Sequence, residues 1–500
     1  MSVSERFDVI VVGSGAGGGL VAGELADSGV SVLLLEAGPH RTAADFTRWE
    51  AHANHDIWFP PTLVEPAVAG APPLAVIRGR CVGGTSTVNT KVALRPSDED
   101  YAKWHDASGL PGAGGNPFGA ADMAPHFARV EARLGVRERS DWQQCIRTVV
   151  PGFQAMGAEL APVMSYTDAN CMRCGSCLQG CPTNAGKNSM NVYIHPPWAQ
   201  GRLTLRAGCT VQRVVIEDRG SGLEATGIEY RDADGRVHAV DASAVVVAGG
   251  AMATPQLLLR SGIREAADGS PSSRLIGRHV GWHPARIIAG LFDEPQDAHM
   301  VYPISAHCMN FQRDADGGFI VEAATIQDPI GFAVMVADEN GVPMWGRELS
   351  ETVQRYRYFA GLLTMVTDEN TGTAWIDEDD RDRYSYEWSA VVQERDVAAQ
   401  RFAREALLAA GAKRVLPSSQ SSTHVQGGCR MGSDPERSVV NEHAESHDVR
   451  RLFVGDGSVV PCTLSVNPSL TIMSLASRLA AYLAGGEHGY FERASAHAAA

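Results

Sequence analysis

The sequence has no excess of positive charge and no long apolar run. Its 43 lysines and arginines are outnumbered by 58 aspartates and glutamates, for a net charge of −15, whereas nucleic-acid binding requires clustered basic residues to neutralise phosphates. No apolar stretch approaches the roughly 20 residues of a membrane-spanning helix. The first apolar segment begins at Phe7, which leaves no room for a secretory signal peptide before it. We therefore expect a cytoplasmic protein with no nucleic-acid partner and no membrane span.

Repeats of fixed period are also absent, while the length argues for more than one domain. Five hundred residues exceed what one hydrophobic core normally serves, so two domains are expected. The ten cysteines are expected to be free thiols or ligands, because disulfides are rare in the cytoplasm.

The densest signal lies in residues 7–36, where a short apolar run is followed by glycines in the order G-x-G-x-x-G, a helical pattern and a second apolar run. Gly13 permits the tight turn, Gly15 lets the backbone approach a pyrophosphate, and Gly18 lets the helix pack on the strand. The second run ends in Glu36, whose carboxylate can accept hydrogen bonds from a ribose. The order and spacing predict a dinucleotide site at the helix N-terminus.

Small and polar residues form further blocks along the chain. Residues 79–89 read G-R-C-V-G-G-T-S-T-V-N, where paired glycines before small hydroxyls allow the backbone to lie against a flat or phosphorylated ligand. Four later blocks are G-A-M-A-T-P-Q-L-L-L-R-S-G-I at 250–263, H-V-Q-G-G-C-R-M-G at 424–432, V-G-D-G-S-V-V-P at 454–461 and N-P-S-L-T-I at 467–472.

In this order the blocks resemble the glucose-methanol-choline (GMC) oxidoreductases, flavoproteins that oxidise alcohols. The cysteine-containing segment 174–189 is most similar to the long-chain alcohol oxidase branch of that family. Two positions depart from the family pattern: Arg264 replaces a glycine that usually closes the second signature, and Gly428 replaces a common threonine. The resemblance implies an α/β fold in which an FAD-binding Rossmann-like domain is interleaved with an antiparallel-sheet substrate domain.

The expected domain boundaries follow from these blocks. We expect the FAD-binding domain in three parts (1–100, 201–290 and 401–485), a connecting and cap region at 101–200, the substrate-binding domain at 291–400 and a tail at 486–500. Alternating patterns at 356–367 and 375–388 predict antiparallel strands, one face of which would roof a ligand pocket.

The resemblance implies FAD as the cofactor, with Asp456 at the ribityl chain and the Val211 backbone at the adenine. The expected cofactor-binding residues are Gly13, Gly15, Gly18, Glu36, Gly83, Gly84, Ser86, Asn89, Val211, Asp456, Asn467 and Pro468. Some relatives link FAD covalently to a histidine near the Gly-Gly-x-Ser block. Residues 87–89 are Thr-Val-Asn, so we expect dissociable FAD.

Oxidising an alcohol requires the hydroxyl proton to leave as hydride moves to flavin N5, so the site needs a neutral base. A neutral imidazole such as that of His424 accepts this proton, and Asn467 can hold the hydroxyl as donor or acceptor. The resemblance makes this pair the catalytic residues. For His283 we expect a structural role.

Four cysteines follow one another at short spacings: Cys171, Cys174, Cys177 and Cys181. Their C-x2-C-x2-C-x3-C-P pattern is that of ferredoxins and predicts a four-iron or three-iron cluster that relays electrons. Cys145 or Cys209 could replace one of the four as a remote ligand. A thiol-rich loop without metal is an alternative, and so is zinc, for which the spacing is tight.

The leading interpretation is an enzyme that oxidises an alcohol or sugar hydroxyl to a carbonyl and passes electrons to O₂ or an external acceptor. A cluster would favour a dehydrogenase, and its absence an oxidase. The alternative is a flavin and iron–sulfur electron carrier or redox sensor. A carrier needs no base at the flavin, so the presence of both His424 and Asn467 favours the enzyme.

Overall fold

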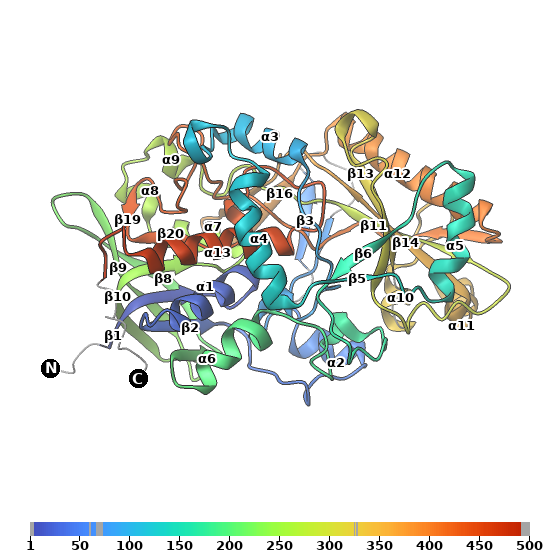
Figure 1. Cartoon of the computed structure of the whole chain (residues 1–500), viewed down its shortest axis with the longest axis horizontal. Coiled ribbons are helices and arrows are strands. Elements are labelled where there is room, and N and C mark those ends of the chain that lie inside the picture. Colours follow the sequence, from blue (N-terminus) through green and yellow to red (C-terminus); the bar gives the residue numbers. More distant parts are fainter. Residues whose placement is uncertain (1–4, 60–61, 67–73, 325, 327–328, 492–500) are drawn as a thin grey trace.

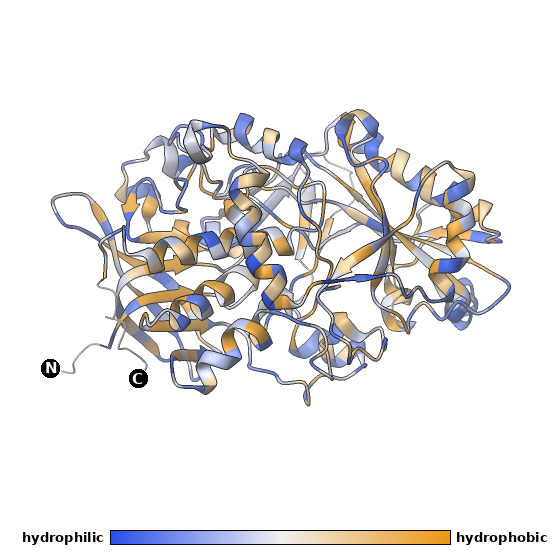
Figure 2. Ribbon diagram, viewed as in Figure 1, coloured by the Kyte–Doolittle hydropathy of each residue, from blue (hydrophilic) through white to orange (hydrophobic). Residues whose placement is uncertain are grey.

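The computed structural model describes residues 5–59, 62–66, 74–324, 326 and 329–491. Within this part of the chain the strands form two sheets, each the centre of one lobe (Figure 1). The first lobe holds both ends of the described chain, and the second is capped by two long helices on its outer side. Apolar residues concentrate on the strands inside each lobe (Figure 2).

The first sheet has β1 (Arg6–Val12) at its centre, parallel to β2 (Val32–Glu36) on one side and to β10 (Val237–Val247) on the other. Its path is β19-β9-β10-β1-β2-β7, with β20 paired to β10 and β8 paired to β9. The remaining strands are β7 (Leu203–Ala207), β8 (Thr210–Asp218), β9 (Leu223–Arg231), β19 (Val449–Arg450) and β20 (Leu452–Val454). The predicted buried parallel strand and Rossmann-like fold are confirmed.

Helix α1 (Ala16–Asp27) packs into this lobe with almost no clearance. A Cβ on Gly17 would lie 2.0 Å from the carbonyl oxygen of Gly455, and one on Gly18 would lie 2.1 Å from that of Gly13. Helix α13 (Ser469–Gly485) packs on α1, and α4 (Ala120–Leu134) packs on α13. Glycines therefore allow the first helix to approach two loops of the sheet.

The second sheet follows the path β15-β16-β3-β4-β18-β11-β14-β13-β12-β6-β5, with β17 paired to β11. Its strands are β3 (Thr62–Pro66), β4 (Leu74–Val76), β5 (Arg137–Arg139), β6 (Ala161–Ser165), β11 (Ala285–Leu291), β12 (Ile304–Cys308), β13 (Phe319–Ala324), β14 (Phe359–Val366), β15 (Thr373–Ile376), β16 (Asp382–Tyr386), β17 (Arg414–Pro417) and β18 (Ser421–Ser422). Helices α5 (Gln144–Ala155) and α12 (Ala390–Ala409) cover its outer face.

This sheet is larger than the predicted substrate domain at 291–400. Strands from residues 62–76, 137–165 and 414–422 join it, because pairing partners on neighbouring strands can be far apart in the chain. Two of its pairings, β16 with β3 and β18 with β4, are parallel rather than antiparallel. Strand β14 and the β15–β16 hairpin lie where the alternating patterns predict strands.

The other helices connect the two lobes or cover their edges. They are α2 (Glu50–Asp56), α3 (Asp98–Ser108), α6 (His195–Ala199), α7 (Ala253–Arg260), α8 (Ile263–Ala266), α9 (Pro271–Arg274), α10 (Pro329–Met335) and α11 (Gly346–Gln354). Of the predicted tail, residues 492–500 lie outside the described part, while Tyr490 packs near Phe453 and donates its hydroxyl to Glu445 at 2.6 Å.

Candidate active site

Two glycine loops meet at the N-terminus of α1. The Gly83 N–H donates to Ser14 Oγ at 2.9 Å, and a Cβ on Gly84 would lie 2.9 Å from Gly15 Cα. A Cβ on Gly15, in contrast, would meet no protein atom within 4 Å. The space beside Gly15 is thus free of protein where free N–H groups begin a helix, which fits the pyrophosphate of FAD.

Glu36 lies directly beside this loop at the end of β2. Its Oε2 accepts from Ser14 Oγ at 2.6 Å and from Ser14 N at 3.1 Å, and its Oε1 accepts from Gly38 N at 2.8 Å. The Cys209 N–H donates to the backbone carbonyl of Glu36 at 2.8 Å, which brings the start of β8, with Val211, next to it. The residues predicted for the ribose and the adenine are therefore neighbours.

Asp456 is buried and bonded to two loops at once. Its Oδ1 accepts from the N–H and hydroxyl of Ser458 at 2.8 and 2.5 Å, and its Oδ2 accepts from Gly250 N and Thr254 Oγ1 at 2.7 and 2.5 Å. A carboxylate offers about four lone-pair sites. A ribityl hydroxyl would have to replace one of these donors. In the structure the Asp456 carboxylate connects the segments that carry them.

The predicted residues Ser86, Asn89 and Pro468 also belong to connected loops. The Ser86 hydroxyl donates to Gly83 O at 2.6 Å. Asn89 Nδ2 donates to Tyr166 Oη at 2.7 Å and reaches the Ser469 hydroxyl at 3.5 Å. Pro468 is the N-cap residue that directly precedes α13. The 79–89 block is thereby linked to the loop that carries Asn467.

His424 and His283 come from loops that run side by side. Gly281 and Gln426 exchange two backbone hydrogen bonds of 2.8 and 3.0 Å, and the two imidazole ring centres are 5.2 Å apart. Burial lowers the pKa of His424 to about 4, so its imidazole is neutral at neutral pH. Neither ring nitrogen of the buried His283 has a partner within the described residues. The structural role of His283 stays a prediction, and the structure places this residue beside the predicted base.

Buried side chains tie these loops to the one that carries Asn467. Asp368 accepts from Trp282 N at 2.5 Å and from Thr463 Oγ1 at 2.5 Å. Gln426 Oε1 accepts from Leu464 N at 3.3 Å. The fold therefore brings the loops of the predicted catalytic pair together, although 43 residues separate the two positions.

Asn467 is 4% exposed and faces an acidic residue that our sequence interpretation missed. Its Nδ2 lies 3.5 Å from Oε2 of Glu322, which is fully buried in β13. The signal in the sequence was a lone acid within the apolar strand F-I-V-E-A-A. A charged residue is almost never fully buried without a reason in packing or chemistry.

Cys171, Cys174, Cys177 and Cys181 border one small cavity. All ten cysteines are free thiols, and Cys145 and Cys209 are not among the described residues that line this space. Across the described ranges no three His, Cys, Asp or Glu side chains are arranged to hold a metal ion. The predicted cluster ligands are thus gathered at one cavity but are not arranged as a metal site.

A buried cation lies next to these thiols. The Lys91 ammonium is inaccessible to solvent and donates to the backbone carbonyls of Ser86 and Thr87 at 2.5 and 3.3 Å. Burial lowers its pKa to about 8, an effect opposed by the nearby Cys177 and Cys181 sulfurs. Lys91 therefore links two of the cysteines to the backbone of the predicted cofactor loop at 79–89.

Models of the GMC oxidoreductase family match residues 7–285 and 364–476. The chain belongs to the GMC oxidoreductase family. The long-chain-alcohol oxidase FAO3 of Arabidopsis thaliana is 26% identical over 94% of this chain and 67% of its own. An uncharacterized GMC-type oxidoreductase of Mycobacterium tuberculosis is 31% identical over 95% of this chain and 75% of its own. The crystal structure of pyridoxine 4-oxidase superposes with a TM-score of 0.75 at 19% identity, covering 95% and 99% of the two chains.

As a GMC oxidoreductase, the protein is an FAD-dependent enzyme that acts on CH–OH donors, as the resemblance implies. The match spans about two thirds of the FAO3 sequence. In the part of this GMC oxidoreductase that the structure describes, no helix is long and apolar enough to cross a membrane. The cytoplasmic location stays a prediction.

Proposed function

We propose that this GMC oxidoreductase oxidises an aliphatic alcohol to the carbonyl compound, with His424 as the base and Asn467 as the residue that holds the hydroxyl. The observation that carries the proposal is the placement of a neutral imidazole on a loop tied to that of a buried amide. Because its pKa is about 4, His424 is free to accept a proton throughout the neutral range.

FAD would be held by the loops at Gly13–Gly18 and Gly83–Ser86, by Glu36 and by the start of α13. When bound, it supplies the acceptor for the hydride that leaves the alcohol carbon. Residues 87–89 hold no histidine and Val88 is buried, so we propose that the cofactor dissociates without a covalent bond to break.

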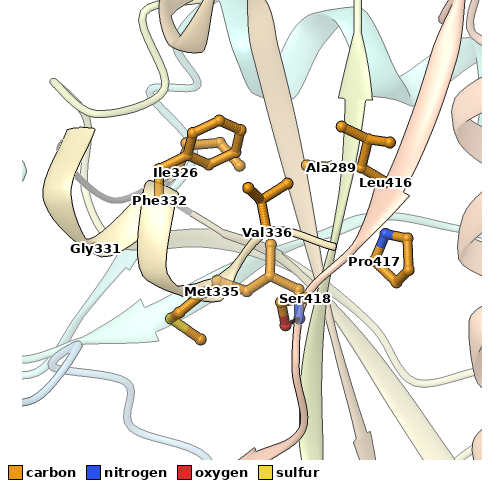
Figure 3. A pocket seen from close by; sticks show the side chains of 10 residues that line it. Ala289, Ile326, Gly331, Phe332, Met335, Val336, Leu416, Pro417 and Ser418 are labelled. Carbon is orange, nitrogen blue, oxygen red and sulfur yellow. Dashed lines mark hydrogen bonds between the residues drawn. The ribbon is translucent and has the colours of Figure 1, made fainter. Parts of the chain in front are cut away.

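A small apolar cavity in the second lobe is the reason for proposing an aliphatic substrate. It is lined mainly by aliphatic and aromatic side chains from β11, β17 and α10, among them Ile287, Ala289, Phe332, Met335, Val336 and Leu416 (Figure 3). In the sheet register Ile287 is opposite Leu363, which is opposite Glu322. Directly paired residues share one face of a sheet, so the cavity opens on the face that carries Glu322.

Met335→Glu tests the aliphatic substrate, because a carboxylate in the cavity wall opposes burial of an alkyl chain, worth about 0.8 kcal/mol per CH₂. We expect KM for octan-1-ol to rise on the order of tenfold or more, with a smaller effect on ethanol. The measurement is anaerobic bleaching of the flavin absorbance by each alcohol. Val334→Glu is the matched control, since Val334 is on the same helix but 77% exposed. Equal effects of the two substitutions would contradict this use of the cavity.

The electron relay through the cysteine segment stays a prediction that the ferredoxin spacing and the shared cavity support. Anaerobic iron and sulfide analysis is expected to find about three or four irons per chain. Cys177→Ser should remove the cluster absorbance and slow reduction of an artificial acceptor, while Cys308→Ser, at a buried cysteine elsewhere, should not. If the iron-free protein is fully active, the cysteines form a structural loop and the flavin passes its electrons directly to O₂ or another acceptor.

A further inference from the structure

Glu322 is an acid whose surroundings do not suit a charge. All six residues of β13 are buried, and Glu322 has no solvent exposure and no ion pair among the described residues. Its Oε2 is 3.5 Å from Asn467 Nδ2, whereas its Oε1 has no partner in the described part of the chain. Buried carboxylates are normally paired with cations or with several donors.

The amide of Asn467 also has an oxygen that lacks a hydrogen-bond partner within the described chain. Its Nδ2 faces Glu322, but its Oδ1 also has no partner within the described chain. An ionised carboxylate can only accept hydrogen bonds and cannot satisfy this oxygen. A protonated carboxyl can do both, because its O–H donates to Oδ1 while its carbonyl accepts from Nδ2. This cyclic pair would satisfy both unpartnered oxygens at once.

The neighbours of Glu322 favour the protonated form. Burial raises the pKa of Glu322 to about 8 and outweighs the hydrogen bond from Asn467. On β12 the residue opposite is His307, whose pKa burial lowers, so its imidazole is neutral. On β14 the residue opposite is the apolar Leu363. No positive charge on either neighbouring strand therefore stands opposite the carboxyl to keep it ionised.

We propose that Glu322 is a positioning residue that, as a neutral carboxylic acid, holds the Asn467 amide through two hydrogen bonds and directs its remaining N–H at the substrate oxygen. An unrestrained amide could turn either its oxygen or its nitrogen to the substrate. With the amide held, Asn467 is a donor, which stabilises the negative charge that develops on the oxygen as His424 takes the proton. This inference rests on the proposed roles of His424 and Asn467.

Glu322→Gln and Glu322→Leu separate hydrogen bonding from packing. Glutamine can form the same two hydrogen bonds with Asn467, so we expect kcat within about threefold of wild type. Leucine has similar volume without donors, and we expect kcat to fall about 10²-fold with little change in KM. Flavin content checks that each variant is folded. A leucine variant with wild-type kcat, or a glutamine variant as slow as the leucine one, would overturn the proposal.

The pH profile provides a signature that a packing role would not change. Because only the protonated carboxyl donates to Asn467, wild-type kcat should fall as pH rises through the raised pKa of Glu322. Glu322→Gln should lose this decline, since its amide does not titrate. A decline of equal size and midpoint in both proteins would assign it to another group and overturn the proposal.

An infrared difference spectrum tests the protonation state without turnover. Wild type minus Glu322→Gln should show the C=O stretch of a protonated carboxylic acid at neutral pH, and a control, Glu131→Gln, at a half-buried glutamate paired with Arg95, should show only carboxylate bands. Carboxylate bands for Glu322 would overturn the proposal. If no alcohol reduces the flavin but the acid band is present, the proposed function fails and the acid–amide pair stands.

Discussion

Replacing His424 with alanine is expected to lower kcat on an alcohol about 10²–10⁴-fold while FAD remains bound. The imidazole is the only base that we place at the hydroxyl. Rapid mixing without oxygen, followed by the flavin absorbance, measures the step directly. Replacement of His238, a surface histidine paired with Asp232, is the matched control and should leave the rate unchanged.

The proposed role of His424 also predicts how the reaction rate depends on pH. His424 accepts a proton only when neutral, so activity is present above its pKa of about 4 and lost as pH falls through it. The profile should be flat through the weakly acidic range and fall only as pH approaches this pKa. Unchanged turnover of the alcohol by the alanine variant would remove His424 from the reaction.

Two neighbouring glycines should respond to alanine in different ways. At Gly17 the new Cβ would lie 2.0 Å from the Gly455 carbonyl oxygen. Its nearest neighbours are all backbone atoms, which cannot rotate away as a side chain can, so α1 or the 455–458 loop must shift. Overpacking of this kind typically costs about 1–3 kcal/mol, and we expect a lower Tm together with loss of FAD. Thermal unfolding of the protein stripped of flavin measures the first effect.

Gly15→Ala is the matched partner of this variant. Gly15 has φ −60°, which alanine adopts freely, and its Cβ would meet no protein atom. The flavin-free protein should therefore keep its Tm, while the methyl group occupies the space proposed for the pyrophosphate and lowers FAD affinity about tenfold or more, or 1.4 kcal/mol. Titration with FAD measures it. Unchanged affinity would place the pyrophosphate elsewhere.

Local sequence predicts most of the first lobe. The order of strand, glycines, helix, strand and acid in residues 7–36 corresponds to β1, α1 and β2, because the patterns of strand, turn and helix are local. The closest contact of a Cβ on Gly18 is also local, the Gly13 carbonyl oxygen, whereas Gly13 itself lies against Ala248. Gly17 shows what the local sequence does not predict. The atom that its Cβ would strike belongs to Gly455, more than 400 residues later, and no spacing within the fingerprint indicates it.

The extent of the second sheet is harder to predict from the sequence. Strands β3, β4, β17 and β18 are short, and they are stabilised by pairing with segments far away in the chain. The alternation of apolar and polar residues identifies β14, which is long enough to have such a pattern. It also identifies β15 and β16, which are close in sequence and form a hairpin. A strand of two or three residues has no such pattern.

By itself the sequence determined the dinucleotide fingerprint, which depends on residue types at fixed local spacing, and the resemblance to the family, which implies the roles of His424 and Asn467. Only the tertiary structure decided that His283 is beside His424, that Asp456 is tied to two loops, and that Glu322 faces Asn467. The reason is physical: protonation, hydrogen bonding and the cost of an unpartnered atom depend on what is packed around a group, and those neighbours come from distant parts of the chain.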